Sequence, residues 1–327
     1  MALDFEHLGS DFIRALRGSR SQAALSRRLG FRTNVLYAWE SGRRWPTAAL
    51  VLQAAQRLRF DVKGLLRRFF ANAPPWLEPI DPTTRAGVAQ LLEELRGKIP
   101  VVELARRTGS SRYAIARWLA GTAEPRFPDF LRLFEGASLR VLDFVALFHD
   151  PNTLPSAAPG WQALQAHRRA VYEFPWISAV LGVLELAEYT ALPRHTPGWI
   201  AQRLGIPREE EQRCLDVLER SGQIVRKGRR WQLARSQTVD TRQDPAAERQ
   251  LKQWWAELGV ARLRAGAPGQ FSFNVFAVSR ADYERLRELH QSYFRQLRSI
   301  VAQSSPSERI IAANVQLFPL DEPPGRS

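Results

Sequence analysis

The sequence of 327 residues contains a single cysteine, Cys214, and only five histidines, which lie far apart from one another. A lone cysteine excludes a framework of intrachain disulfides and is typical of a protein from a reducing compartment. No two histidines have the spacing of zinc ligands, and neither a glycine-rich phosphate loop nor a serine elbow is present. The sequence therefore predicts no metal site and no cofactor, and it gives no support for an enzyme.

Long apolar runs are missing as well. Nowhere do 18 apolar residues follow one another, so we expect no membrane-spanning helix. The first ten residues contain Asp4 and Glu6 and lack an apolar run, so we expect no secretory signal peptide. Positive charge, in contrast, is abundant: 47 Lys and Arg stand against 33 Asp and Glu, a net charge of +14. This excess indicates a polyanionic partner and a cytoplasmic protein associated with the nucleoid.

The first 150 residues contain the same pattern twice, 79 positions apart. The repeated residues include Leu16-Arg17-Gly18 and Leu95-Arg96-Gly97, then Trp39, Gly42 and Pro46 against Trp118, Gly121 and Pro125. A register kept without a gap indicates a duplicated structural unit, and two copies are too few for a solenoid. Residues 1–79 hold 13 basic and 6 acidic side chains, a net +7, whereas residues 80–150 hold 10 and 9, a net +1.

Each unit is predicted to contain five helices. In the first unit, Ser21 is expected to cap a second helix that ends at Gly30, where the chain often needs positive φ. A third helix is expected from about Arg32 to the Ser41-Gly42 pair, because the following Pro46 cannot lie inside it. Two further amphipathic helices are expected over residues 48–58 and 62–70.

Residues 21–30 and 39–46 resemble the lambda-repressor-like (Xre-type) helix-turn-helix family. The resemblance implies an exposed recognition helix whose first residues reach base edges in the major groove. It assigns base contacts to Thr33, Asn34 and Tyr37 and phosphate contacts to Gln22 and Arg32. Two arginines that follow the helix, Arg43 and Arg44, are placed to contact the DNA backbone.

The residue types agree with this assignment. Asparagine can pair bidentately with adenine, and threonine can meet the methyl group of thymine. The alternative is that Thr33 and Asn34 merely cap the third helix, which both residue types do well.

The second unit is a weaker copy of the first. Val101 replaces Gln22, so the side-chain amide for a phosphate is lost, and Leu119 replaces Glu40. Its equivalent contact positions hold Arg112, Tyr113 and Arg117, which can still meet guanine or the DNA backbone. Two alternatives stand: the second unit is a packing partner, or the two units form an intramolecular pseudo-dimer on half-sites about one helical turn apart.

From Trp161 onward a different order of elements is expected. Helices over residues 176–192, 197–204 (capped by Thr196) and 208–221 precede a hairpin over residues 224–233, which together predict a winged helix. The basic hairpin tip, with Lys227, Arg229 and Arg230, is placed to lie on phosphates. The third helix, however, begins with Glu209-Glu210-Glu211. We expect these side chains to form a solvated face, whose negative charge the phosphates of DNA would repel. Docking or dimerisation is therefore the alternative role of this domain.

The last segment is expected to be a small α+β element. Helices are predicted over residues 249–264 and 282–302, and alternating patterns predict strands over residues 271–278 and 310–320. The strands could pair across a dimer axis or wall a ligand pocket. The aromatic residues of this region are interpreted as core rather than pocket. They are Trp254, Trp255, Phe271, Phe273 and Phe276.

Residues 161–320 also resemble a bacterial family of regulators whose carboxy-terminal domain has no known function. The residues that carry the resemblance are Trp199-Ile200-Ala201, Thr238-Val239-Asp240-Thr241 and Gln316-Leu317-Phe318-Pro319-Leu320. The resemblance implies transcriptional regulation and supplies no effector.

Together these patterns predict a mainly α protein with two tandem five-helix helix-turn-helix domains (1–72 and 83–150), joined and followed by linkers (73–82 and 151–160). A winged helix (161–241) and an α+β region for dimerisation or signal input (242–327) complete the expected order. The predicted function is sequence-specific binding of double-stranded DNA by a homodimeric transcription regulator. The alternatives are a regulator gated by a small-molecule or protein effector and an adaptor that uses helix-turn-helix folds to dock other proteins.

Overall fold

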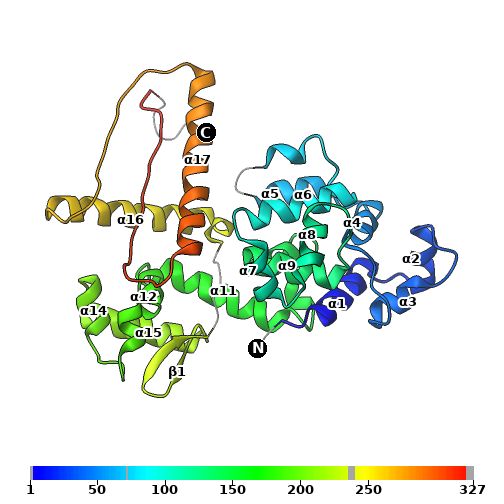
Figure 1. Ribbon diagram of the computed structural model, residues 1–327, viewed down its shortest axis with the longest axis horizontal. Coiled ribbons are helices and arrows are strands. Elements are labelled where there is room, and N and C mark those ends of the chain that lie inside the picture. Colours follow the sequence, from blue (N-terminus) through cyan, green and yellow to red (C-terminus); the bar gives the residue numbers. More distant parts are fainter. Residues whose placement is uncertain (1–2, 71–72, 235–239, 322–327) are drawn as a thin grey trace. The chain divides into compact units, whose positions relative to one another are not determined.

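The computed structural model of the chain describes residues 3–70, 73–234 and 240–321 (Figure 1). These residues are mainly α-helical, as predicted, and within them one two-stranded sheet is formed. They divide into two compact units, residues 3–165 and 166–321. None of the described helices is both long enough and apolar enough to cross a membrane.

The first half of unit 1 contains five helices in the predicted order. They are α1 (Phe5–Arg17), α2 (Gln22–Arg28), α3 (Val35–Glu40), α4 (Ala48–Arg57) and α5 (Val62–Phe69). The Ser21 hydroxyl caps α2 by accepting the Ala24 amide at 3.1 Å, and Gly30 after α2 has φ +88°, both as predicted. Helix α3 begins at Val35, later than expected, because the Ser26 hydroxyl rather than a helical carbonyl accepts the Leu36 amide.

The second half of unit 1 repeats this order after a short 3-10 turn, η1 (Pro75–Leu77). Its helices are α6 (Arg85–Arg96), α7 (Val101–Thr108), α8 (Arg112–Leu119), α9 (Phe127–Ser138) and α10 (Val141–Ala146). A second 3-10 turn, η2 (Pro151–Thr153), leads into α11 (Ala158–Glu173), inside which the boundary between the two units falls.

A reciprocal backbone contact joins equivalent positions of the two halves. The Ala48 amide donates to the Pro125 carbonyl at 3.0 Å, and the Phe127 amide donates to the Pro46 carbonyl at 2.9 Å. Ala48 and Phe127 are 79 positions apart, and so are Pro46 and Pro125. The contact therefore relates the two repeats by a pseudo-two-fold axis.

The axis passes through an antiparallel bridge between Thr47 and Arg126. Around it, one continuous hydrophobic cluster contains buried side chains from both repeats, with the rings of Phe12 and Phe127 5.1 Å apart. The segments expected as linkers also contribute to this cluster, through Leu77 in the first and Leu154 and Ala157 in the second. The two repeats thus share one core.

Unit 2 continues with four helices, a hairpin and two long helices. The elements are α12 (Ile177–Leu184), α13 (Ala187–Ala191), α14 (Trp199–Leu204), α15 (Arg208–Arg220), β1 (Ile224–Lys227), β2 (Arg230–Leu233), η3 (Thr241–Gln243), α16 (Pro245–Arg264) and α17 (Arg280–Gln303). The hairpin forms as predicted, with Ile224 opposite Leu233 and Lys227 opposite Arg230.

Two local predictions for unit 2 are wrong. The single helix expected over residues 176–192 is broken into α12 and α13, because Leu186 has an extended backbone with ψ 141°. The side chain of Thr196 does not cap α14, since the helix begins after Gly198, whose φ of +93° suits glycine. The backbone amides at the start of α14 donate instead to the carboxylate of Glu211 on α15.

The predicted carboxy-terminal strands are also wrong. Residues 271–278 and 310–320 are outside every helix and strand of the described chain, and Figure 1 draws them as extended loops, one leading into α17 and one following it. A strand requires a hydrogen-bonded neighbour, and no described residue provides one. The two helices of this region form as predicted, while its α+β character does not appear.

Candidate nucleic-acid interface

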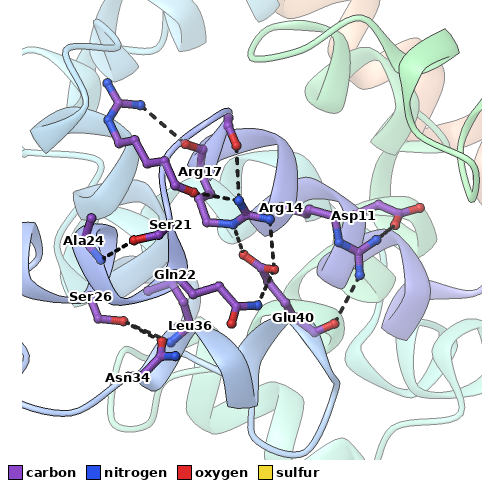
Figure 2. A network of polar contacts seen from close by, with 12 residues as sticks. Asp11, Arg14, Arg17, Ser21, Gln22, Ala24, Ser26, Asn34, Leu36 and Glu40 are labelled. Atoms are coloured by element: carbon purple, nitrogen blue, oxygen red, sulfur yellow. Dashed lines mark hydrogen bonds and ion pairs between the residues drawn. The ribbon is translucent and has the colours of Figure 1, made fainter.

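The turn between α2 and α3 holds the residues expected to read bases. Thr33 and Asn34 are exposed, and Asn34 directly precedes α3. The Ser26 hydroxyl donates to Asn34 Oδ1 at 3.3 Å and accepts the Leu36 amide at 3.2 Å (Figure 2). Asn34 makes no side-chain cap bond to α3, so its capping role is not found, and its amide nitrogen has no partner among the described residues.

A buried polar network holds α3 against α1 and α2. The carboxylate of Glu40, 8 % exposed, accepts the Nε of Arg17 at 2.6 Å and the Nε2 of Gln22 at 2.8 Å (Figure 2). One N–H of the Gln22 amide is thus used inside the protein, and the other is left for the expected phosphate contact. Sequence reasoning did not identify Arg17 and Glu40. The available signal was that Gln22 and Glu40 are both replaced in the second repeat.

Exposed cations surround this turn. Arg32 lies before α3, and Arg43 and Arg44 lie after it, all with exposed side chains. The Arg43 guanidinium lies 5.2 Å from the ring of Tyr37, which is itself 48 % exposed. This contact brings together one residue expected to meet a base and one expected to meet phosphate.

The second repeat presents a different surface. Arg112, Tyr113 and Arg117 are exposed on α8, and the Arg112 guanidinium lies 5.3 Å from the Tyr113 ring. On the preceding helix α7, Arg106 and Arg107 both bind Glu103, whose pKa they lower to about 2 through hydrogen bonds. These two arginines are partly neutralised, whereas the exposed arginines around α3 have no acidic partner among the described residues.

The hairpin tip of unit 2 is basic, as expected. Lys227 and Arg229 are exposed on either side of Gly228, whose φ is +64°. Arg230 is half-buried and donates to the Tyr189 carbonyl at 3.4 Å, so it is held back against the body of the unit.

The acidic start of α15 is only partly a solvated face, and for Glu211 that prediction is wrong. Glu211 is 2 % exposed, and its carboxylate accepts the amides of Gly198 at 2.9 Å and Ala201 at 2.5 Å. It caps α14 in the place expected for Thr196. Burial lowers the pKa of the neighbouring His195, and the carboxylate of Glu211, 3.6 Å away, opposes this effect.

The aromatic residues of the carboxy-terminal region divide into two groups. Trp254 and Trp255 of α16 are half-buried, and Trp254 packs edge-on against Trp176 with ring centroids 5.1 Å apart. Phe271, Phe273 and Phe276 are exposed, so the expectation that they belong to a core is wrong.

The described residues do not form a metal site, and the single cysteine is buried. No group of three or more His, Cys, Asp or Glu side chains there is arranged to hold a metal ion. Cys214 is buried in unit 2, and burial raises the pKa of its thiol to about 12.

A family model described as a domain of unknown function (DUF4423) matches residues 157–320. The match covers the resemblance found from Trp161 to Leu320, of which Thr238 and Val239 lie outside the described residues. No helix-turn-helix family model matches the two repeats. No curated protein and no solved structure matches the chain.

Proposed function

The chain belongs to the DUF4423 family, and we propose that it is a sequence-specific regulator that binds double-stranded DNA through unit 1. The family description states no function, so the proposal depends on the residues of the chain itself. The observation that carries it is the exposed Thr33-Asn34 pair at the start of α3, which the α2 side chain of Ser26 holds in place.

The chemistry of this pair suits base edges. The Asn34 carboxamide has an unused donor, and its oxygen retains a lone pair beside the Ser26 hydroxyl, as bidentate recognition of adenine requires. Arg32, Arg43 and Arg44 supply the positive charge for phosphates on both sides of the helix. In this arrangement α2 and α3 act as the positioning and recognition helices of an Xre-type unit.

The reciprocal bridge supports the pseudo-dimer among the alternatives for the second repeat. If α3 and α8 both act as recognition helices, the two-fold axis between them makes them meet DNA half-sites in inverted orientation. The two halves of the proposed site differ, because α3 presents Thr33 and Asn34 where α8 presents Arg112 and Tyr113. We therefore expect an imperfect inverted repeat, with guanine favoured on the side of Arg112.

Unit 2 supports a secondary contact with DNA. Its helices α12 to α15 and its basic hairpin are compatible with a winged helix, and Lys227 and Arg229 are exposed and able to lie on phosphates. The carboxylate of Glu211 is buried and adds no exposed charge to the start of α15. Glu209 is exposed, and its negative charge still repels the phosphates of DNA. We assign unit 2 mainly to dimerisation or signal input.

Selection from a random duplex DNA library tests the proposal. Binding of the enriched sequence is then titrated against salt for the wild type, T33A/N34A, R112A and the control Thr196→Ala, an exposed threonine of unit 2. We expect the double variant to lose sequence preference while keeping the steep salt dependence, because phosphate contacts remain. We expect R112A to lose preference in one half of the site only.

Other results discriminate between the alternatives. If R112A selects the same DNA sequence as the wild type, the second repeat is a packing partner and does not contact bases. No enriched sequence would contradict the regulator and favour a protein-docking adaptor built on the same folds.

A further inference from the structure

Exposed apolar side chains are concentrated in one part of unit 2. Of the twenty large apolar side chains that are exposed in the described residues, sixteen lie between Val260 and Leu320. The most exposed are Phe273 at 90 %, Ile311 at 81 % and Val275 at 76 %. Single exposed apolar residues are common on protein surfaces, but so many in one stretch of the chain indicate an interaction surface.

Two extended segments carry much of this surface. The first pairing segment is residues 271–278, and the second is residues 310–318. Their sequences are rich in aromatic and β-branched residues, as strands are. Within the described chain, however, their backbone amides and carbonyls form no hydrogen bonds. Each segment is therefore an open strand edge with apolar side chains, which natural proteins normally cover.

The two long helices of this region also leave apolar side chains exposed. Helix α16 has no buried residue over its whole length, and α17 exposes Leu289, Ile300 and Val301. In a soluble protein, the apolar face of a long helix is usually packed against a partner, from which most of its stability comes.

The start of the second pairing segment is fixed by contacts with α12 and α13. The Ala187 amide of α13 donates to the Ser307 carbonyl at 2.8 Å. The side chain of Ile310 lies against Gly182 of α12, where an added Cβ would come within 2.9 Å of Ile310 Cδ1. Glycine at position 182 thus permits the close approach that fixes where this segment leaves the body of unit 2.

We propose that the two pairing segments form an intermolecular sheet with those of a second copy of this chain, which makes the protein a homodimer through unit 2. This deepens the proposed function by naming the partner of unit 2. The second copy offers the same two segments, so a closed two-fold arrangement can give every segment a hydrogen-bonded neighbour without a further protein. In such an arrangement each segment that crosses the axis meets its own counterpart antiparallel.

Charge and area favour a second copy. Neither pairing segment contains a charged residue, so two chains of net charge +14 can approach there without placing like charges in contact. If the sixteen exposed side chains lose about 50 Å² each on average on association, one copy contributes the roughly 800 Å² of a standard interface.

The first test measures mass without DNA. Light scattering during gel filtration of the full chain is expected to give twice 37.2 kDa for the wild type. F273E/V275E is expected to be monomeric, because each copy would bring two buried charges, four in all, to the shared sheet. The control Val102→Glu, at an exposed valine of unit 1, is expected to stay dimeric. A monomeric wild type or a dimeric F273E/V275E would overturn the inference.

The second test locates the interface by amide hydrogen exchange. We expect slow exchange within residues 271–278 and 310–318 in the wild-type dimer and fast exchange there in monomeric F273E/V275E, with equal protection in unit 1. A dimer whose pairing segments exchange fast would overturn the inference. Neither test uses DNA, so a monomer that selects a DNA site contradicts the dimer alone, and a dimer that selects none contradicts the regulator alone.

Discussion

The guanidinium of Arg17 lies 2.6 Å from the carboxylate of Glu40, and this contact joins the end of α1 to the end of α3. In the second repeat the equivalent positions hold Arg96 and Leu119, and Arg96 binds Glu93 of its own helix. Both repeats contain the arginine, and only the first contains its buried glutamate partner. Helices α3 and α8 are therefore held in place by different interactions.

Replacing Glu40 with leucine, as in the second repeat, is expected to destabilise unit 1. The change leaves Arg17 largely buried without its carboxylate, a situation that costs about 3 kcal/mol. Urea unfolding measures the loss, and exposed Glu219→Leu serves as the control, with an expected change within about 0.5 kcal/mol. The double variant R17L/E40L should recover much of the stability, since an apolar pair replaces the ion pair. A double variant as unstable as E40L would refute this account.

Glu211→Ala is expected to destabilise unit 2 by about 1–3 kcal/mol, because the buried Ala201 amide and the part-buried Gly198 amide at the start of α14 lose their acceptor. Thermal unfolding compares it with Glu209→Ala, which removes an exposed carboxylate of the same acidic run. Equal effects of the two substitutions would show that the cap contributes nothing.

Asn34→Ala and Arg43→Ala are expected to affect DNA binding in different ways. Loss of the Asn34 carboxamide should cost about 1–3 kcal/mol against the selected sequence and little against random DNA. Loss of the Arg43 guanidinium should weaken binding to the selected sequence and to random DNA alike. It should also reduce the slope of log affinity against log salt concentration by about 1. Fluorescence anisotropy over a salt series measures both quantities. The prediction fails if both variants weaken selected and random DNA equally.

Stability of unit 1 is expected to fall below pH 6.5 through His149. Its ring packs against Phe12 and Phe60, its Nε2 is buried without a hydrogen-bond partner in the described chain, and burial lowers its pKa below the ordinary 6.5. The unfolded chain then binds a proton near pH 6.5 that the folded chain binds only at lower pH. The stability that the neutral His149 ring contributes is therefore complete above pH 6.5. It is lost as the pH falls through the pKa of His149 in the folded chain.

The measurement is thermal unfolding at pH 7.5 and 5.5 for the wild type and His149→Phe. The variant should lose less stability between the two values, by at most about 1.4 kcal/mol per pH unit. Parallel losses in both proteins would assign the effect to other groups.

Cys214 is expected to resist thiol reagents in the native protein. Its pKa of about 12 leaves almost no thiolate at pH 8, and the side chain is buried. Reaction with a chromogenic disulfide should proceed only in denaturant, where the thiol regains an ordinary pKa. Rapid modification of the folded chain would show that α15 opens readily.

The local elements were predictable from the sequence because their causes are local. Ser21 caps the helix that follows it, and Gly30 adopts the backbone that glycine alone adopts easily. The 79-residue register placed every helix of the second repeat from the first. The candidate surface around α3 followed from the same motif, since Thr33 and Asn34 are exposed where the resemblance puts them.

The remaining features depend on contacts between distant residues. Three consecutive glutamates look alike in sequence, and only Glu211 reaches amides 10 to 13 positions earlier. The alternation over residues 271–278 predicts a strand correctly only if a partner is present, and the single chain provides none. Such pairing cannot be read from periodicity, because periodicity describes which face is apolar and not what covers it.

The bridge between Thr47 and Arg126 places a two-fold relation inside one polypeptide. In a dimer of identical chains every substitution appears on both sides of the axis at once, so the two sides cannot diverge. Here a mutation at Asn34 leaves its counterpart Tyr113 untouched. One half can retain its chemistry while the other acquires a different one, so covalent duplication allows an originally symmetric surface to evolve toward unequal halves.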